Sequence, residues 1–140
     1  MTEVQAVEAI IQAWRTGWEA RQPLVPWTTE NEVFETAAAW ARISITHTSS
    51  AQATMGAPGA RRWDRRGIIA VQLFTTPNVG IAVAAGLADD VRAVLEGVRL
   101  VAGDAPRELD SGAGQTGGES TDGAWLMRMI ALPFRYQQQR

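Results

Sequence analysis

Four arginines lie around a single tryptophan in the segment GAPGARRWDRRG, residues 56–67. Guanidinium groups bind carboxylates and phosphates through directed, paired hydrogen bonds, and an indole ring adds a large apolar face. The segment therefore has the chemistry to bind an anionic partner. Its residues leave three interpretations open: a contact between subunits, a solvated surface that blocks random pairing of strand edges, and a nucleic-acid-binding patch. The side chains concerned are Arg61, Arg62, Trp63, Arg65 and Arg66, with Asp64 among them.

Patterns for catalysis or for a cofactor are missing from the sequence. It contains no cysteine and one histidine, His47, and no G-x-S-x-G elbow accompanies that histidine. We interpret His47 as a strand residue with an ordinary hydrogen bond. The run GAGQTGG, residues 112–118, lacks the lysine of a phosphate-binding loop, and the neighbouring Asp89 and Asp90 diverge on a helix. We expect a protein that is not an enzyme and that has no cofactor and no metal.

The bulk composition indicates one globular domain over residues 1–140. Apolar residues make up 46% of the chain and charged residues 20%, and the net charge is −2. This balance excludes a chain-wide attraction to nucleic acid, so any such binding has to come from a local patch. The N-terminus has no basic n-region, and no apolar stretch approaches about 18 residues. We therefore expect neither a signal peptide nor a membrane span, and a soluble protein made in the cytoplasm.

The first expected element is an amphipathic helix over about residues 3–19. Thr2 and Gln5 form a capping-box pattern at its start. Apolar residues recur at spacings of three and four, and Pro23 and Pro26 prevent the helix from continuing. An extended segment is expected over 25–34, with a turn at Glu30 and Asn31. The expected apolar stripe of the helix consists of Val4, Val7, Ile11, Trp14 and Trp18.

Residues 40–74 are expected to form one long, protruding β-hairpin. AWARISITHT, residues 39–48, alternates between its two faces, and GIIAVQLFTTP, residues 67–77, is apolar on both faces, which is typical of a central strand. Gly56, Pro58 and Gly59 supply the reversal between the strands. The tip is MGAPGA, and the arginines lie on the returning strand.

The second half of the chain predicts a helix, a strand, a loop and a closing strand. The helix covers about 79–96 and ends at Gly97, and a strand covers about 98–109. Residues 110–123, rich in Gly, Ser and Thr, are expected to be a mobile loop. The closing strand covers 124–136, where Pro133 indicates a sheet edge or the end of the strand. Together these elements predict the α+β class: an antiparallel or mixed sheet with a long extended hairpin and two helices packed on one face.

The six tryptophans divide into core and surface candidates. Trp27 and Trp63 have no obvious core partner and are the better candidates for an interface. The others are expected to pack inside the protein, namely Trp14 and Trp18 on the first helix and Trp40 and Trp125 across the sheet.

Several of these motifs, taken in order, resemble one known family. The strand WARISITHTSS (40–50) is followed by AQATMGAPGARRWDRRGIIAVQLFTTPNVG (51–80), by AAGLADDVRAVLEG (84–97) and by the closing ALPFRY (131–136). This order resembles the small tail-terminator proteins encoded with the tail genes of long-tailed phages, prophages and gene transfer agents. The run around GAPGARRWDRRG is the most specific part of the resemblance. The match covers about residues 27–100, and residues 110–123 have no counterpart in it.

The resemblance implies a structural protein of the virion, with a tail-tube-like fold. Such proteins form a six-membered ring on the head-proximal end of the tail tube, stop tube polymerisation and offer a surface to the head-completion (stopper) protein. The implied partners are further copies of the chain, the tail tube protein and the head-completion protein. Genome DNA would pass through the lumen without sequence-specific binding, no membrane would be involved, and assembly would take place in the host cytoplasm.

A ring with head-to-tail contacts joins two different patches of the same chain. We therefore expect the arginines to meet an acidic strip of the next subunit, either Glu30, Glu32 and Glu35 or Asp89 and Asp90. Trp27 and Trp63 are expected at the same contact. Two alternatives stay open: another neck or minor tail component of the same particle, and a nucleic-acid-binding module that uses the segment 61–66.

Overall fold

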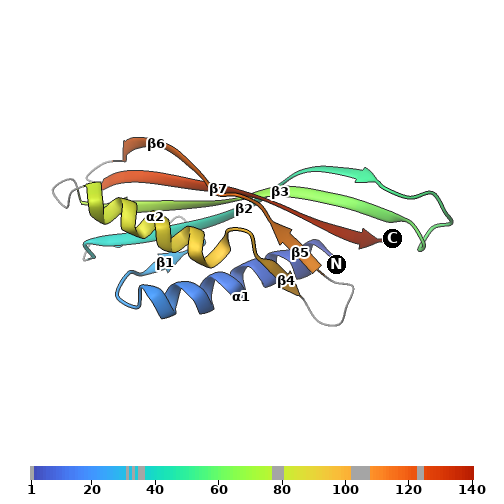
Figure 1. Ribbon diagram of the computed structural model, residues 1–140, viewed down its shortest axis with the longest axis horizontal. Coiled ribbons are helices and arrows are strands. Elements are labelled where there is room, and N and C mark those ends of the chain that lie inside the picture. Colours follow the sequence, from blue (N-terminus) through green and yellow to red (C-terminus); the bar gives the residue numbers. More distant parts are fainter. Residues whose placement is uncertain are drawn as a thin grey trace.

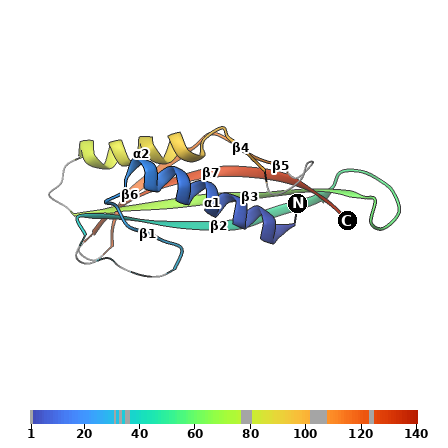
Figure 2. The same cartoon turned by 90° about the horizontal axis from the view of Figure 1, so that it is seen from below.

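The fold is α+β: one mixed sheet carries two helices on one of its faces (Figures 1 and 2). This confirms the expected fold class. The computed structural model describes residues 2–30, 32, 34, 37–76, 81–101, 108–122 and 125–140. In chain order the elements are α1 (Glu3–Arg21), β1 (Trp27–Thr28), β2 (Ala39–Gln52), β3 (Arg62–Thr75), α2 (Ile81–Leu95), β4 (Arg99–Val101), β5 (Glu108–Ser111), β6 (Gln115–Asp122) and β7 (Trp125–Gln139).

The sheet has seven strands and is organised around β3. Its order is β1-β2-β3-β7-β5-β4, and β6 pairs with β7 on the same side as β5. β1 runs parallel to β2, and the other pairs are antiparallel. β2 and β3 form the expected long hairpin, with register from Ala39 opposite Thr75 to Gln52 opposite Trp63. β3 is paired on both sides, which confirms it as a central strand.

The core lies between the helices and the facing side of the sheet. Alternate residues of β2, β3 and β7 point to this side because successive side chains of a strand face opposite ways. Trp14 and Trp18 stack there with ring centroids 4.7 Å apart, which confirms both as core residues. The largest buried side chains around them are Ile10, Ile43, Ile69, Leu73, Leu95, Leu109, Ile130 and Leu132.

Helix α1 begins at the expected cap but buries a different stripe. Gln5 N donates to Thr2 Oγ1 at 3.3 Å and Thr2 N donates to Gln5 Oε1 at 2.9 Å, which confirms the capping box. The expected stripe is wrong at Val4, whose side chain is 65% exposed. The buried residues are spaced by four, because the two stacked indoles set which face meets the sheet, and they are Ala6, Ile10, Trp14 and Trp18.

Helix α2 follows its expected pattern and packs closely on α1. Leu87, Val91 and Leu95 are buried, and Gly97 adopts a φ of +65° just after the helix, as its expected role as a C-cap requires. A Cβ added at Gly17 of α1 would lie 2.6 Å from Val94 Cγ1 of α2. The absence of a side chain at Gly17 therefore permits the close approach of the two helices.

The segment after α2 differs from the expectation. The single strand over 98–109 is two short antiparallel strands, β4 and β5, with residues 102–107 outside the described part. The mobile loop expected over 110–123 is also wrong, because Asp110 and Ser111 belong to β5 and β6 pairs with β7. Backbone pairing needs no apolar side chain, and it satisfies the N–H and C=O groups along this side of β7.

Pro133 lies inside β7 and not at the edge of the sheet, so this expectation is wrong as well. Ile68 of β3 lies opposite it on one side. On the other side β5 pairs with β7 as far as Phe134, and β6 begins opposite Ala131. The Pro133 carbonyl accepts from Gly112 N at 2.8 Å, so the missing N–H of Pro133 faces the break between β5 and β6. Proline fits here because the neighbouring strand is interrupted at this point.

Candidate interaction surface

The hairpin extends past the helices as a protruding arm (Figure 1). We call residues 48–66 and 135–140 the β-arm. It is wider than a two-stranded hairpin, because β7 pairs with β3 from Leu126 opposite Thr75 to Gln139 opposite Arg62. At the arm's base, the register of β2 shifts between His47 and Ser49. The expected protrusion is present, and a third strand stiffens it.

The arginines of the β-arm are divided between its two faces. Arg65 lies on the side that carries the helices, together with Trp63. Arg62 and Arg66 point to the helix-free side because residues of a strand alternate. Arg61 lies just before β3, and its Nε donates to the Gly56 carbonyl at the tip at 2.7 Å. The basic segment of the sequence is therefore not a single patch in three dimensions.

On the helix-bearing side, Trp63 is half-buried and covered by Arg65. The Arg65 guanidinium carbon lies 5.4 Å from the indole centroid, and Arg65 Nε donates to Gln138 Oε1 at 3.2 Å. This cation–π contact occupies one of the two ring faces on which a nucleic-acid base could stack.

The single histidine lies at the base of the same side. His47 Nε2 is 2.7 Å from the hydroxyl of Tyr136, and His47 Nδ1 is 3.5 Å from Glu3 Oε1. Burial raises the pKa of Tyr136 above its usual value of 10.0, Glu3 raises it further, and Arg65 opposes both effects. Among the described residues His47 has these two polar partners and no serine nucleophile. As expected, His47 lies in a strand and within hydrogen-bond distance of another side chain.

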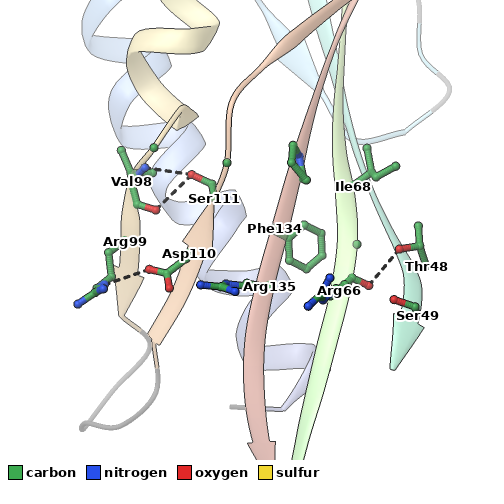
Figure 3. Close-up of a pocket in the computed structure, with 14 residues that line it drawn as sticks. Thr48, Ser49, Arg66, Ile68, Val98, Arg99, Asp110, Ser111, Phe134 and Arg135 are labelled. Atoms are coloured by element: carbon green, nitrogen blue, oxygen red, sulfur yellow. Dashed lines mark hydrogen bonds and ion pairs between the residues drawn. The ribbon is translucent and has the colours of Figure 1, made fainter. Parts of the chain in front are cut away.

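On the helix-free side, charged residues form a row across the sheet (Figure 3). The row lines an open hollow of about 740 Å³ together with Ile68 and Pro133. Each member lies opposite the next in the strand register: Arg99 of β4, Asp110 of β5, Arg135 of β7 and Arg66 of β3, with the uncharged Ser49 of β2 opposite Arg66. Sequence reasoning found Arg66 but missed Arg135 and Arg99, because the pairing of β7 with β3 and β5, and of β5 with β4, could not be read from the sequence.

Arg66 and Arg135 face each other, and Asp110 lies opposite Arg135 on its other side. Asp110 is already engaged, since Arg99 Nε lies 3.0 Å from its Oδ1. Asp64, on the same side of the arm, accepts from Gln137 Nε2 at 3.2 Å. Within the described residues, neither Arg66 nor Arg135 has an ion-pair partner. Like charges directly opposite each other in a sheet are destabilising, so the pair is suited to bind an anionic group.

The candidate acidic strip lies near the other end of the sheet. Glu30 and Glu32 are exposed and follow β1, which pairs with β2 at Ala41 and Arg42. The Glu30 amide donates to Thr28 Oγ1, and the Glu32 carbonyl accepts from Arg42 Nη2 at 3.2 Å. In the described part of the chain, neither carboxylate has an ion-pair partner. Glu35 lies outside that part.

The alternative acidic candidates on α2 have partners within the chain. Asp90 accepts from Gln22 Nε2 and lies 3.6 Å from Arg21 Nη1. Asp89 lies 3.6 Å from Arg92 Nη1. Glu30 and Glu32 are therefore the better acidic counterpart for an arginine of another molecule.

Trp27 does not lack a core partner, so this expectation is wrong. Its ring meets Trp14 edge to face at a centroid distance of 6.3 Å, and Trp27 Nε1 lies 3.4 Å from Glu19 Oε1. The indole is half-buried and packs against the main core. Trp40 and Trp125 do contact each other across the sheet, at 6.1 Å, as expected.

Two further features are absent from the described residues. No group of three or more His, Cys, Asp or Glu side chains there is arranged to hold a metal ion. No helix in that part of the chain is long and apolar enough to cross a bilayer.

Comparison with known proteins shows the fold and no more. No protein-family model matches the chain, and no curated protein matches it. Six chains of solved structures do match. One of them has a TM-score of 0.70, covers 96% of this chain and 95% of its own and is 20% identical, and its name states no function. At this identity the likeness establishes a shared arrangement of helices and strands over almost the whole length.

Proposed function

We propose that the protein is a structural tail terminator of a phage or gene transfer agent. It forms a ring on the head-proximal end of the tail tube, stops polymerisation by offering no further tube-binding face, and provides the joining surface for the head-completion protein. It acts without enzymatic chemistry and without a cofactor. The proposed location is the virion tail, after assembly in the host cytoplasm.

The observation that carries the proposal is the protruding β-arm, on which two arginines make no ion pair with any described residue. Among the described residues, Arg66 and Arg135 have no ion-pair partner, and neither do Glu30 and Glu32 elsewhere on the chain. A surface of this kind is completed by a second molecule, and two complementary patches on one chain lead to head-to-tail rings. The resemblance of the arm's sequence to tail terminators supports the same function.

The test is tube growth in the presence of the protein. The tail tube protein of the same gene cluster is polymerised with and without this chain, and tube lengths and ends are imaged by negative-stain electron microscopy. We expect shorter tubes that carry a ring at one end. Unchanged tube lengths with no density at either end would contradict the proposal. Density elsewhere in purified tails would favour another neck or minor tail component.

The nucleic-acid alternative has a separate measurement. Binding through the segment 61–66 would retard short DNA in a gel at low salt, and the effect would fall steeply as salt rises. We expect no retardation, because Arg65 covers the ring of Trp63 and the arginines face opposite ways.

A further inference from the structure

The helix-free side of the sheet carries a hollow that the sequence motifs do not explain. Its centre is the opposed pair Arg66 and Arg135, its floor includes Ile68 and Pro133, and the Thr48 and Ser49 side chains line one side (Figure 3). Guanidinium groups, hydroxyls and an apolar floor together favour an anionic group attached to a chain with some apolar contact.

We propose that this hollow receives the Glu30 and Glu32 carboxylates of a second copy of the chain. The inference rests on the proposed ring function, since it names the contact that joins neighbouring subunits. The sequence analysis expected the arginines of residues 61–66 at the subunit contact. The proposed contact uses two arginines instead, and one of them, Arg135, lies outside that segment. Among the described residues, neither these two arginines nor the two glutamates have an ion-pair partner, so two cations on one surface match two anions on the other.

The Glu30 and Glu32 carboxylates of the same chain do not reach this hollow. Glu30 is two residues beyond Thr28, which lies opposite Arg42 of β2. The hollow is bordered by Ser49, further along the same strand. At about 3.3 Å per residue, Arg42 and Ser49 are about 23 Å apart along β2. Pairing therefore joins two molecules, and it joins different patches, as a head-to-tail contact requires.

The cost of the arginine pair within one chain supports a role between chains. Opposed like charges on neighbouring strands destabilise the isolated subunit, and a pair of carboxylates from a neighbour removes that repulsion. The substitution Arg66→Glu therefore has two effects of opposite sign. It places a carboxylate opposite Arg135 and stabilises the subunit, but it repels the incoming carboxylates and weakens association.

The experiment measures self-association of the purified full chain by sedimentation across a concentration series, with thermal unfolding alongside. We expect Arg66→Glu to weaken association by about tenfold or more while the midpoint of unfolding stays level or rises. Arg62→Glu is the matched control, because Arg62 has the same charge and lies on the same side of the same strand but does not line the hollow. Arg66→Gln serves as a second variant that removes the charge without reversing it.

A mixing experiment identifies the partner. A Glu30→Arg, Glu32→Arg double variant is expected to associate poorly alone, as does Arg66→Glu. An equimolar mixture should recover association, because each reversed hollow then meets a reversed acidic strip. Recovery also shows that both variants are folded.

Three results would overturn the inference: undiminished association of Arg66→Glu, equal loss in Arg62→Glu, or no recovery on mixing. Wild-type protein that stays monomeric at every concentration would overturn it too. None of these results decides whether the protein caps the tail tube, which the tube-length measurement tests separately. Failure of the proposed subunit contact can therefore be told apart from failure of the proposed function.

Discussion

At the scale of single residues, Tyr136 connects the base of the β-arm to the first helix. Its side chain is 3% exposed, its hydroxyl lies 2.7 Å from His47 Nε2, and Glu3 at the start of α1 lies on the far side of that imidazole. Tyr136 is the only tyrosine, and the sequence contains no lysine and no cysteine. Its phenol is therefore the one side chain expected to titrate near pH 10.

Because Tyr136 is the one side chain expected to titrate near pH 10, its ionisation predicts how stability depends on pH. Burial, and secondly Glu3, raise the folded-state pKa of Tyr136 above 10.0, so the folded state holds the phenolic proton more tightly than the unfolded state. The stability that results is fully present below the unfolded pKa and is lost as pH rises through the folded pKa. We expect the free energy of unfolding, measured by urea denaturation, to fall above about pH 10. A tyrosinate absorbance titration should show ionisation delayed relative to the urea-unfolded chain.

Tyr136→Phe is the control for this effect. It keeps the buried ring and removes the titrating hydroxyl and its hydrogen bond, so it should lower stability by about 0.5–1.5 kcal/mol at neutral pH. The variant should also lose the alkaline fall. An equally steep fall in the variant would show that another process is responsible.

At the scale of elements, the arm emerges where β2 bulges and Gly67 of β3 lies opposite His47. The Phe134 ring of β7 lies over Gly67, so a Cβ there would be 2.5 Å from Phe134 Cζ and would also collide with the Thr46 carbonyl oxygen. Packing among the three neighbouring strands at this point sets the direction of the arm. The glycine is needed for space, since its φ is not in the left-handed region.

We therefore expect Gly67→Ala to destabilise the fold by about 1–3 kcal/mol through overpacking. Gly86→Ala is the matched control, because a Cβ at Gly86 meets nothing within 4 Å on the exposed side of α2. Alanine there should stabilise the helix by about 0.5–1 kcal/mol. Chemical denaturation of both variants checks the opposite signs, and similar effects of the two would refute the packing argument.

At the scale of the whole molecule, a net charge of −2 conceals an uneven distribution. The β-arm carries Asp64 as its only acidic side chain, whereas Glu30 and Glu32 follow β1, which pairs with β2 at Ala41 and Arg42, away from the arm. Such a chain is suited to head-to-tail association with copies of itself. The basic residues of the arm are Arg61, Arg62, Arg65, Arg66, Arg135 and Arg140.

Association driven by these charges should depend on salt. Between about 0.01 M and about 1 M ionic strength the Debye length falls from about 30 Å to about 3 Å. We expect the proposed rings to dissociate progressively over this range, as followed by sedimentation of the wild-type chain. Association that strengthens with salt would instead indicate an apolar contact, in which case the exposed arginines would not be the main determinant.

The local elements followed from the sequence because their signals are local. Thr2 and Gln5 cap α1, Gly97 ends α2, and Gly56 to Gly59 reverse the hairpin through interactions among near neighbours in the chain. The alternation of Ile69, Val71 and Leu73 likewise predicted a buried strand face. The failure at Val4 came from the packing of the two indoles, which selected a neighbouring stripe of the same helix.

The tertiary structure alone decided which distant residues share a surface. The pairing of Arg66 with Arg135, and the strand formed by residues 115–122, both depend on where β7 lies against its neighbours. That register is set by the buried residues of three strands and by the interruption at Pro133, and a shift of one position would turn Arg135 to the other face. The sequence by itself determined the two helices, the long hairpin and its basic segment, whereas strand register, a property of the packed sheet, decided which cations face each other.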